Sequence, residues 1–227
     1  MGERIGSEHR EEAGMTPKRP DATSTRQACL DKALAIIGER GLEALSLREV
    51  ARRLGLSHQA PYKHFASRDH LLAELVETLY AEFAAHLDDR PAVEDPFIDL
   101  GNMGVRYLDY AFEWPLRYRL LFGTPLPSAD THPGMMASAR HAFEILESRL
   151  AAMPLRPVRE GGDVTARADA FFIWSTLHGI ASILHSDATL ALRVSHDERE
   201  HLVQHMFDRI GAALRPANCD HPLQGEE

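Results

Sequence analysis

Apolar residues recur at helical spacing along nearly the whole chain from Ser24 onward, and this feature most narrows the possible folds. The first expected helix begins near Thr23–Thr25, ends at Arg40 and has one apolar face, formed by Leu30, Ala33, Leu34 and Ile37. Runs of alternating Val, Ile and Thr, the pattern of a half-buried strand, are not found in the sequence. The sequence therefore predicts an all-α protein.

A short second helix is expected after Gly41, because a capping box marks its start. In Ser46-Leu47-Arg48-Glu49, an S-x-x-E pattern, the serine and glutamate side chains would each bond a free backbone amide of the first turn. This helix would end at Leu54, with Gly55 as a left-handed terminator.

A third short helix is expected from His58 to His64 or Phe65, with Ser57 as its N-cap. Two short helices that meet across a turn containing glycine have the sequence form of a helix-turn-helix. The second of the two is the helix that reads DNA in such a unit.

Pro61 lies inside this third helix, where an interior proline would cost about 3 kcal/mol. With Ser57 as N-cap, Pro61 is the fourth residue of the helix, so the expected loss is one hydrogen bond to the Ser57 carbonyl. Proline also disfavours the αR region for Ala60. We therefore expect a distorted or 3₁₀-like first turn, with His58 and Gln59 projecting at its tip.

The charge distribution is compatible with a nucleic-acid partner for this region. The chain has a formal net charge of -9, yet residues 16–70 contain ten Lys or Arg against six Asp or Glu. A basic head on an acidic body suits DNA binding, although so small an excess also fits an ordinary solvated surface.

Residues 26–80 resemble the DNA-binding domain of TetR/AcrR-type transcriptional repressors. Three stretches carry the resemblance: Leu45 to Ser57, Tyr62-Lys63-His64-Phe65, and Ser67 to Leu72. It implies a homodimer that binds a palindromic operator in double-stranded DNA. Arg68 stands where the family usually has lysine, and Pro61 stands where the family seldom has proline.

The resemblance also implies roles for individual side chains. The candidates for contact with base edges are His58, Gln59, Ala60 and Lys63. The candidates for contact with the DNA backbone are Ser46, Tyr62, His64 and Arg68. Taken singly, Tyr62 would be a core residue and Lys63 a solvated one, so the functional interpretation depends on the ordered set. Phe65 is assigned to the core.

The chain divides on this interpretation into a helix-turn-helix domain (23–68) and a helical effector-binding and dimerisation domain (69–216), with disordered tails at 1–22 and 217–227. A long helix after Ser67 would lead from one domain into the other. Its buried face is expected to contain Leu72, Leu75, Val76, Leu79, Phe83 and Leu87. Further helices are expected at about 97–113, 116–122, 133–152, 168–184 and 196–214.

Residues 97–185 resemble the WHG-type effector domain of a subset of these repressors, chiefly through Trp174-x3-His178-Gly179. The resemblance implies an apolar pocket for an unknown small-molecule effector, in which His178 could offer a hydrogen bond. The expected wall consists of Met103, Tyr107, Tyr110, Trp114, Tyr118, Phe122, Trp174 and His178. The alternative is that these aromatic residues are plain core and that Trp174 and His178 form a satisfied core pair.

The last two long helices suit a four-helix bundle formed by two copies of the chain. Three small residues, Ser175, Gly179 and Ser182, would let a partner helix approach closely. The last helix would contribute Leu202, Met206 and Ile210.

Other classes of function have little support in the sequence. His201-x3-His205 has the spacing of a zinc helix, but Leu202 occupies the glutamate position and no clear third ligand follows, so we expect no metal and no cofactor. Phosphate-binding loops and nucleophile elbows are absent from the sequence, which argues against an enzyme. The remaining alternative is a helical adaptor that binds protein and not DNA through the apolar helix near Trp174.

The cellular compartment is expected to be the cytoplasm. Cys29 and Cys219 form no disulfide framework, which fits a reducing compartment. Residues 1–24 are polar and of mixed charge, unlike a signal peptide or a membrane anchor.

Overall fold

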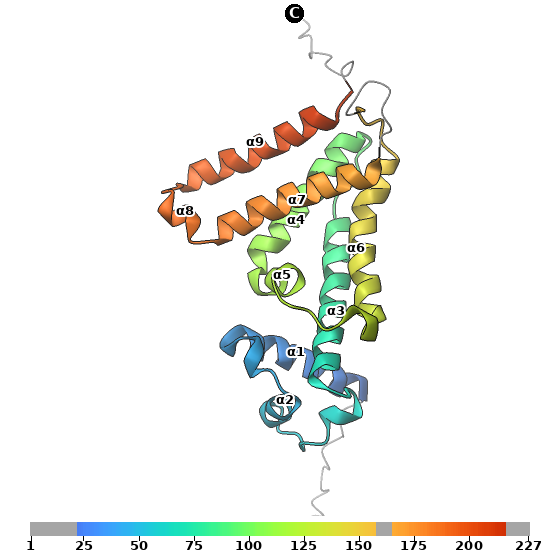
Figure 1. Ribbon diagram of the computed structural model, residues 1–227, viewed down its shortest axis with the longest axis vertical. Helices are drawn as coiled ribbons and strands as arrows, with labels where there is room; N and C mark the ends of the chain where they lie inside the picture. The colour runs from blue at the N-terminus through green and yellow to red at the C-terminus, as the bar shows by residue number, and fades with distance from the viewer. Residues whose placement is uncertain (1–21, 158–164, 217–227) are drawn as a thin grey trace, which may run out of the picture.

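The computed structural model describes residues 22–157 and 165–216, and this part of the chain is entirely helical, as predicted (Figure 1). The N-terminal head contains α1 (Ala22–Arg40), the 3₁₀ helix η1 (Leu42–Ala44), α2 (Leu47–Arg53) and the 3₁₀ helix η2 (Pro61–Lys63). The elements of the body are α4 (Pro96–Glu113), α5 (Pro115–Phe122), η3 (Ala129–Thr131), α6 (Pro133–Ala151), α7 (Ala166–His185), α8 (Ala188–Ala191) and α9 (His196–Leu214). The predicted tails, apart from Ala22, and Cys219 lie outside the described residues.

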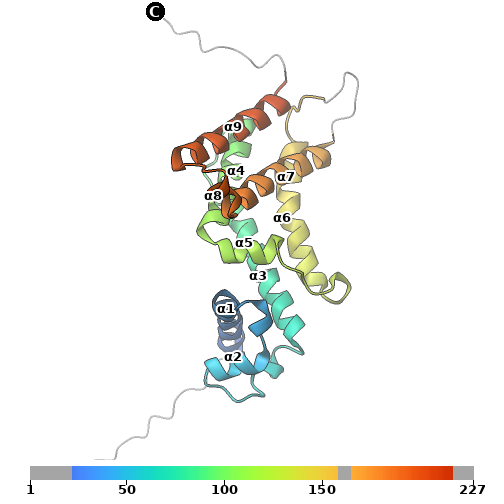
Figure 2. The same ribbon diagram turned by 60° about the vertical axis from the view of Figure 1, so that its left-hand side comes forward.

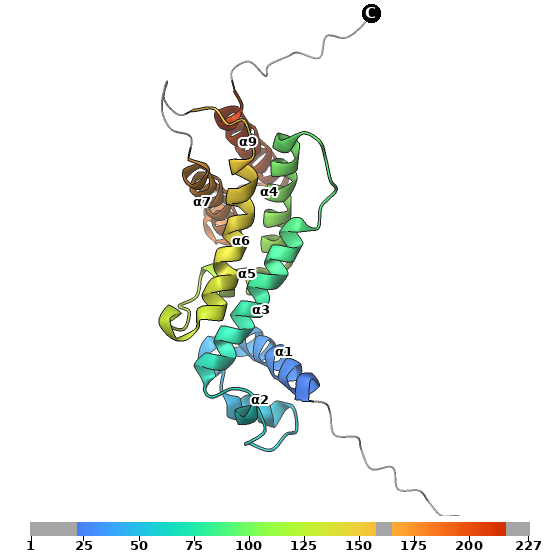
Figure 3. The ribbon, with the colours of Figure 1, turned by 90° about the vertical axis from the view of Figure 1, so that its right-hand side faces the viewer.

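Helix α3 (Arg68–Asp88) joins the head to the body, as Figure 3 shows from the side. It begins at Ser67, whose side chain accepts a hydrogen bond from the His70 amide at 3.2 Å. The face that the sequence predicted to be apolar is buried along its whole length: Leu72, Leu75, Val76, Leu79, Phe83 and Leu87. Since this face contacts α1 at one end and α4, α5 and α6 further along, the two parts of the molecule share one continuous core.

Local capping residues determine where the helices of the head begin and end. Ser46 caps α2, because its Oγ accepts from the Glu49 amide at 3.1 Å, and Gly55 has the left-handed φ of 65° expected of a terminator. The predicted capping box is only half formed, however. The Glu49 carboxylate turns away from Ser46 and binds Arg52 at 2.7 and 2.8 Å and Arg53 at 3.0 Å.

The segment after Gly55 contains a single 3₁₀ turn in place of the helix predicted for residues 58–65. The Ser57 carbonyl accepts from the Ala60 amide at 3.0 Å, so it needs no bond from position 61, where proline has no N–H. Pro61 is the first residue of η2, a position that suits its fixed φ. The expectation for Ala60 was wrong, because this residue has φ -61° and ψ -47°, within the αR region.

The body is a bundle in which α3, α4, α6 and α7 pack around a common interior, while α9 lies along the outside next to α7 (Figures 1 and 2). The short helix α5 lies between this bundle and α1 of the head. The sequence did not predict α8 or η3, which are one turn each. It also missed the capping box at the start of α9, where Ser195 and Glu198 exchange hydrogen bonds of 2.8 and 3.2 Å.

Candidate nucleic-acid interface and ligand cavity

The turn around η2 forms an exposed tip on the head. His58, Gln59 and Lys63 are exposed, and 46% of the Tyr62 surface is accessible to solvent. The buried residues Pro61 and Phe65 hold this tip from inside, the latter with only 1% of its surface exposed. Ala60, a predicted base contact, and His64, a predicted backbone contact, are each half-buried. The proline therefore anchors the turn, and the polar side chains on either side of it point outward.

One residue that the sequence analysis passed over joins this surface. Arg48, in the first turn of α2, lies with His58, Gln59 and Tyr62 around one shallow depression. The signal that could have identified it is its place two residues after the N-cap Ser46, where a side chain stands beside the free amides of a helix start. Guanidinium groups so placed are well suited to phosphate.

Most arginines of the head are paired with carboxylates inside the head. Glu49 binds both Arg52 and Arg53, and these hydrogen bonds lower the pKa of its carboxyl to about 2. Arg48 and Lys63, in contrast, form no ion pair with any part of the chain that the structure describes. The positive charge available at the tip therefore comes chiefly from Arg48 and Lys63.

Arg68 has a structural role in addition to the backbone contact predicted for it. Its guanidinium donates to the carbonyls of Leu45 at 3.1 Å and Leu42 at 3.0 Å, and so ties the start of α3 to the segment before α2. A further nitrogen lies 3.4 Å from Asp69. Because the side chain remains 37% exposed, part of it is still accessible to solvent.

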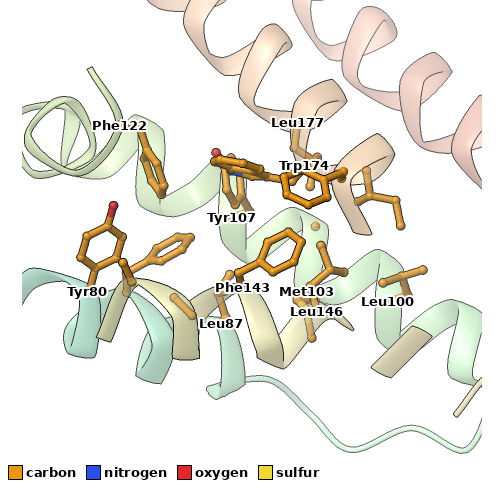
Figure 4. Close-up of a pocket in the computed structure, with 16 residues that line it drawn as sticks. Tyr80, Leu87, Leu100, Met103, Tyr107, Phe122, Phe143, Leu146, Trp174 and Leu177 are labelled. Atoms are coloured by element: carbon orange, nitrogen blue, oxygen red, sulfur yellow. The ribbon is translucent and has the colours of Figure 1, made fainter. Parts of the chain in front are cut away.

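The body contains a cavity of about 210 Å³ between α3, α4, α6 and α7 (Figure 4). Its wall contains apolar and aromatic residues and no charged one: Tyr80, Phe83, Leu87, Leu100, Met103, Gly104, Tyr107, Phe122, Ala139, Ala142, Phe143, Leu146, Phe171, Ile173, Trp174 and Leu177. Four predicted residues belong to it: Met103, Tyr107, Phe122 and Trp174. The sequence analysis missed the walls contributed by α3 and α6.

The other four predicted wall residues lie behind the wall and need correction. Tyr110 is 1% exposed and packs on Phe83, with ring centroids 5.0 Å apart. Trp114 packs on His86 at 5.2 Å at the junction of α4 and α5. Tyr118 and His178 belong to a hydrogen-bonded group next to the cavity.

This hydrogen-bonded group runs from the cavity wall to the outer face of α7. The Tyr107 and Tyr118 hydroxyls are 3.0 Å apart, the Tyr118 hydroxyl is 2.6 Å from His178 Nδ1, and His178 Nε2 is 3.5 Å from Ser182 Oγ. Burial raises the pKa of both tyrosines and lowers the pKa of His178, so the imidazole is neutral near pH 7. Of the two residues in the predicted core pair, only His178 is satisfied by hydrogen bonds within the protein in this way. Trp174 instead faces the cavity.

A second, more open groove of about 520 Å³ lies between α4 and α9. It shares four wall residues with the cavity: Leu100, Gly104, Ile173 and Leu177. On the groove side the Phe207 ring lies so close to Gly104 that a Cβ there would be 2.5 Å from Phe207 Cε1.

The predicted dimer residues do not all lie on one surface. Ser175 and Ser182 are exposed on α7, and a Cβ added at Gly179 would meet no atom within 4 Å. Phe172 and Ile183, each about half exposed, extend this face. On α9, Leu202 is 43% exposed, but Met206 and Ile210 were assigned wrongly, because both are buried in the core of this same chain.

Neither a metal centre nor a membrane span is found among the described residues. They contain no group of three His, Cys, Asp or Glu side chains that could hold a metal ion. No helix in residues 22–157 and 165–216 is both long and apolar enough to cross a bilayer.

Two relatives of known class share sequence with the chain. HTH-type transcriptional regulator Rv1816 of Mycobacterium tuberculosis is 31% identical over 102 residues, which is 44% of this chain and 44% of that protein. HTH-type transcriptional regulator AcrR of Shigella flexneri is 36% identical over 59 residues, which is 26% of this chain and 27% of AcrR. The chain thus spans less than half the length of the curated relatives that it matches.

Solved structures agree with the fold over most of the chain. A Rhodococcus sp. RHA1 protein of unknown function superimposes with a TM-score of 0.69 at 22% identity, covering 91% of this chain and 100% of that one. The regulatory protein SCO4313 superimposes with a TM-score of 0.66 at 26% identity, covering 86% and 98%.

Two family models match in chain order and account for both parts of the molecule. The model described as "Bacterial regulatory proteins, tetR family" matches residues 30–75, which include the exposed tip. The model described as "Tetracyclin repressor-like, C-terminal domain" matches residues 100–210, which include Trp174 and most of the cavity wall. The chain belongs to the tetR family of bacterial regulatory proteins.

Proposed function

We propose that this protein is a homodimeric, ligand-responsive transcriptional repressor of the cytoplasm. It binds a palindromic operator in double-stranded DNA and releases it when a small, largely apolar effector fills the cavity in the body. The observation that carries the proposal is the exposed tip of His58, Gln59, Tyr62 and Lys63, held from inside by the buried Pro61. The matched family consists of regulators, and this agrees with a binding function in place of catalysis.

The tip offers two kinds of contact to a major groove. Gln59 is suited to a bidentate bond with adenine and Lys63 to the acceptors of guanine, each worth about 1–3 kcal/mol of discrimination. Tyr62, Arg48 and the exposed part of Arg68 are suited to phosphates.

The dimer would form through the outer face of α7 around Gly179. This face has exposed apolar side chains at Phe172 and Ile183, while the glycine leaves room for a close helix. Two copies joined there would present two tips to successive major grooves, about 34 Å apart along the duplex.

The response to a ligand would pass through α5. Phe122 at one end of α5 lines the cavity, and Leu116 near its other end packs on Gly38 of α1 in the head. An effector that binds better to one position of α5 than to another would shift the spacing of the two heads by that difference in affinity.

A mobility-shift titration against genomic fragments selected by the protein tests the DNA-binding function. Lys63→Ala and Gln59→Ala should relax the preference at particular base pairs, whereas Tyr62→Ala should weaken binding to all fragments alike. Affinity should also fall steeply as salt is raised. Unchanged affinity in all three variants, or no salt dependence, would favour a protein-binding adaptor.

A further inference from the structure

The hydroxyl groups on the cavity wall are already hydrogen-bonded within the protein, and this restricts what the cavity can bind. Only three wall residues have polar side-chain atoms: Tyr80, Tyr107 and Trp174. The Tyr80 hydroxyl donates to the Leu121 carbonyl at 2.9 Å. The Tyr107 hydroxyl is 3.0 Å from that of Tyr118 and 3.4 Å from His178 Nδ1, and the Trp174 indole lies beside it in Figure 4.

A neutral His178 carries its proton on Nδ1 or Nε2, and we assign it to Nε2, because Nδ1 can then accept from a tyrosine hydroxyl while Nε2 donates toward Ser182. With the proton on Nε2, facing Ser182, the Nδ1 atom accepts from the Tyr118 hydroxyl. The Tyr118 oxygen then accepts from Tyr107, so neither of these hydroxyls is free to donate to a ligand. The Trp174 indole N–H is the one remaining side-chain donor that the described wall could offer to a ligand.

A ligand with a charged or strongly accepting group would therefore lose its hydrogen bonds to water and gain at most one, from the Trp174 indole. An unpaired neutral polar group costs about 1–3 kcal/mol on burial, and an unpaired charge costs more. The cavity wall also provides no cation for a carboxylate or phosphate and no anion for an amine.

The size of the cavity and the aromatic character of its wall restrict the class of ligand further. A cavity of about 210 Å³ exceeds the roughly 150 Å³ that accommodates benzene in an engineered protein core. It therefore suits a compound of on the order of ten non-hydrogen atoms. Phe143, Phe171 and Trp174 pack on one another, with the Phe143 ring centroid 4.8 Å from that of Phe171 and 6.0 Å from that of Trp174, so a flat ring would meet aromatic faces and edges.

We propose that the effector is an uncharged, hydrocarbon-like aromatic compound of about two rings, without a carboxylate, phosphate or ammonium group. This inference rests on the proposed function, since it specifies the ligand of the same cavity. A regulator of this type senses such a compound by its shape and its lack of polar groups.

Matched compounds test the class directly on the full-length protein. We expect 2-methylnaphthalene to bind at least about 100-fold more tightly than 2-naphthoate, which has the same rings with a charge, and 2-naphthol to fall between them. Binding is measured by calorimetry and by quenching of Trp174 fluorescence, with Trp114 as the second tryptophan of the chain. Equal or tighter binding of 2-naphthoate would overturn the proposal, as would failure of all three compounds to bind.

Variants that fill the cavity show whether the binding occurs there. Ala142 is buried on the wall and Ala139 is half-buried, so Ala142→Phe removes most of the space and Ala139→Phe is the milder replacement if the first does not fold. Each should abolish binding of 2-methylnaphthalene, as measured by calorimetry on the folded variant. Binding that survives in a folded variant would overturn the assignment to this cavity.

DNA binding by the protein without any compound is measured in parallel. This measurement distinguishes failure of the proposed regulatory function from failure of the proposed ligand class. Loss of the proposed regulatory function would appear as no selective DNA binding by the unliganded protein. Failure of the ligand class alone would appear as selective DNA binding by a protein that prefers the charged compound.

Discussion

Leu116 of α5 lies against Gly38 of α1, so close that a Cβ on residue 38 would be 2.9 Å from Leu116 Cδ2. This contact joins the head to the body, and it is so close because residue 38 has no side chain. Since the atom in conflict is the end of a flexible leucine, Gly38→Ala should be accommodated by rotation of Leu116. Replacement of a helical glycine should then raise the stability of α1 by up to about 1 kcal/mol.

We therefore expect Gly38→Ala to unfold at the same or higher urea concentration than the parent protein, with a changed response to ligand. Leu116→Ala, which removes the contact, should keep the DNA affinity of the unliganded protein and weaken ligand-induced release. Coupling between sites typically amounts to about 1–3 kcal/mol, so the loss is measurable by DNA titration with and without 2-methylnaphthalene. Full release in Leu116→Ala would exclude a path through this contact.

Substitutions of Arg68 and Lys63 should differ in their effect on the stability of the protein. Arg68→Ala leaves the Leu42 and Leu45 carbonyls without their guanidinium donor, and it should lower the free energy of unfolding by about 1–3 kcal/mol. Lys63→Ala removes an exposed side chain and should change stability by less than about 0.5 kcal/mol while it weakens DNA binding. Urea denaturation of both variants tests this, and equal stability of the two would contradict the structural role of Arg68.

Any side chain at position 104 should lower the stability of the protein while Phe207 is present. Gly104→Ala would force the Phe207 ring away from α4, and overpacking of this kind costs about 1–3 kcal/mol. Combining it with Phe207→Leu should restore part of the loss, because the two positions are in contact and their effects are not additive. A double-mutant cycle by thermal unfolding measures the interaction, and strictly additive effects would exclude the contact.

The stability of the protein should fall as the pH drops below about 6.5. Burial lowers the pKa of His178 from its ordinary value of 6.5, so in this range the unfolded chain binds more protons than the native one. His178→Gln should reduce the slope of unfolding free energy against pH. A smaller slope should remain, because the pKa of His86 is lowered in the same direction. An unchanged slope in the variant would contradict the buried, neutral state of His178.

Gly179 should control assembly without affecting the fold of one chain. Because nothing lies within 4 Å of a Cβ at this position, Gly179→Trp should fold normally and raise the dimer dissociation constant by at least about tenfold. Ala137→Trp, at an exposed position on α6, is the matched control. Sedimentation velocity distinguishes the outcomes, and a dimer as tight as that of the parent protein would place the interface elsewhere.

Features of the head that depend on neighbouring residues could be predicted from the sequence. The cap at Ser46 and the terminator at Gly55 follow from the chemistry of single side chains, and the structure contains both. The extent of the turn around Pro61 could not be predicted in the same way. Whether it continues as a helix depends on how Pro61 and Phe65 are buried, which is a property of the tertiary fold.

The cavity was harder to predict than the helix caps, because it depends on how four helices, α3, α4, α6 and α7, are placed relative to one another. The sequence marked both Tyr107 and Tyr110 as candidate wall residues. Tyr107 lines the cavity, whereas Tyr110 packs behind the wall against Phe83. Ala139 and Ala142 contribute to the cavity by being small, and alanine on a helix carries no sign of such a role in the sequence. Only the relative placement of α3 and α6 reveals that these positions face an open volume.

The four residues shared by the cavity and the α4–α9 groove act as a partition between two compartments. Leu100, Ile173 and Leu177 separate the cavity from the groove, so in the proposed function they would limit the length of the compound that is bound. Trimming one of these side chains would join the two volumes and admit elongated molecules, with no helix repositioned. In the proposed function, selectivity for ligand length would therefore depend on three aliphatic side chains, which makes this partition the simplest place to engineer a sensor for larger compounds.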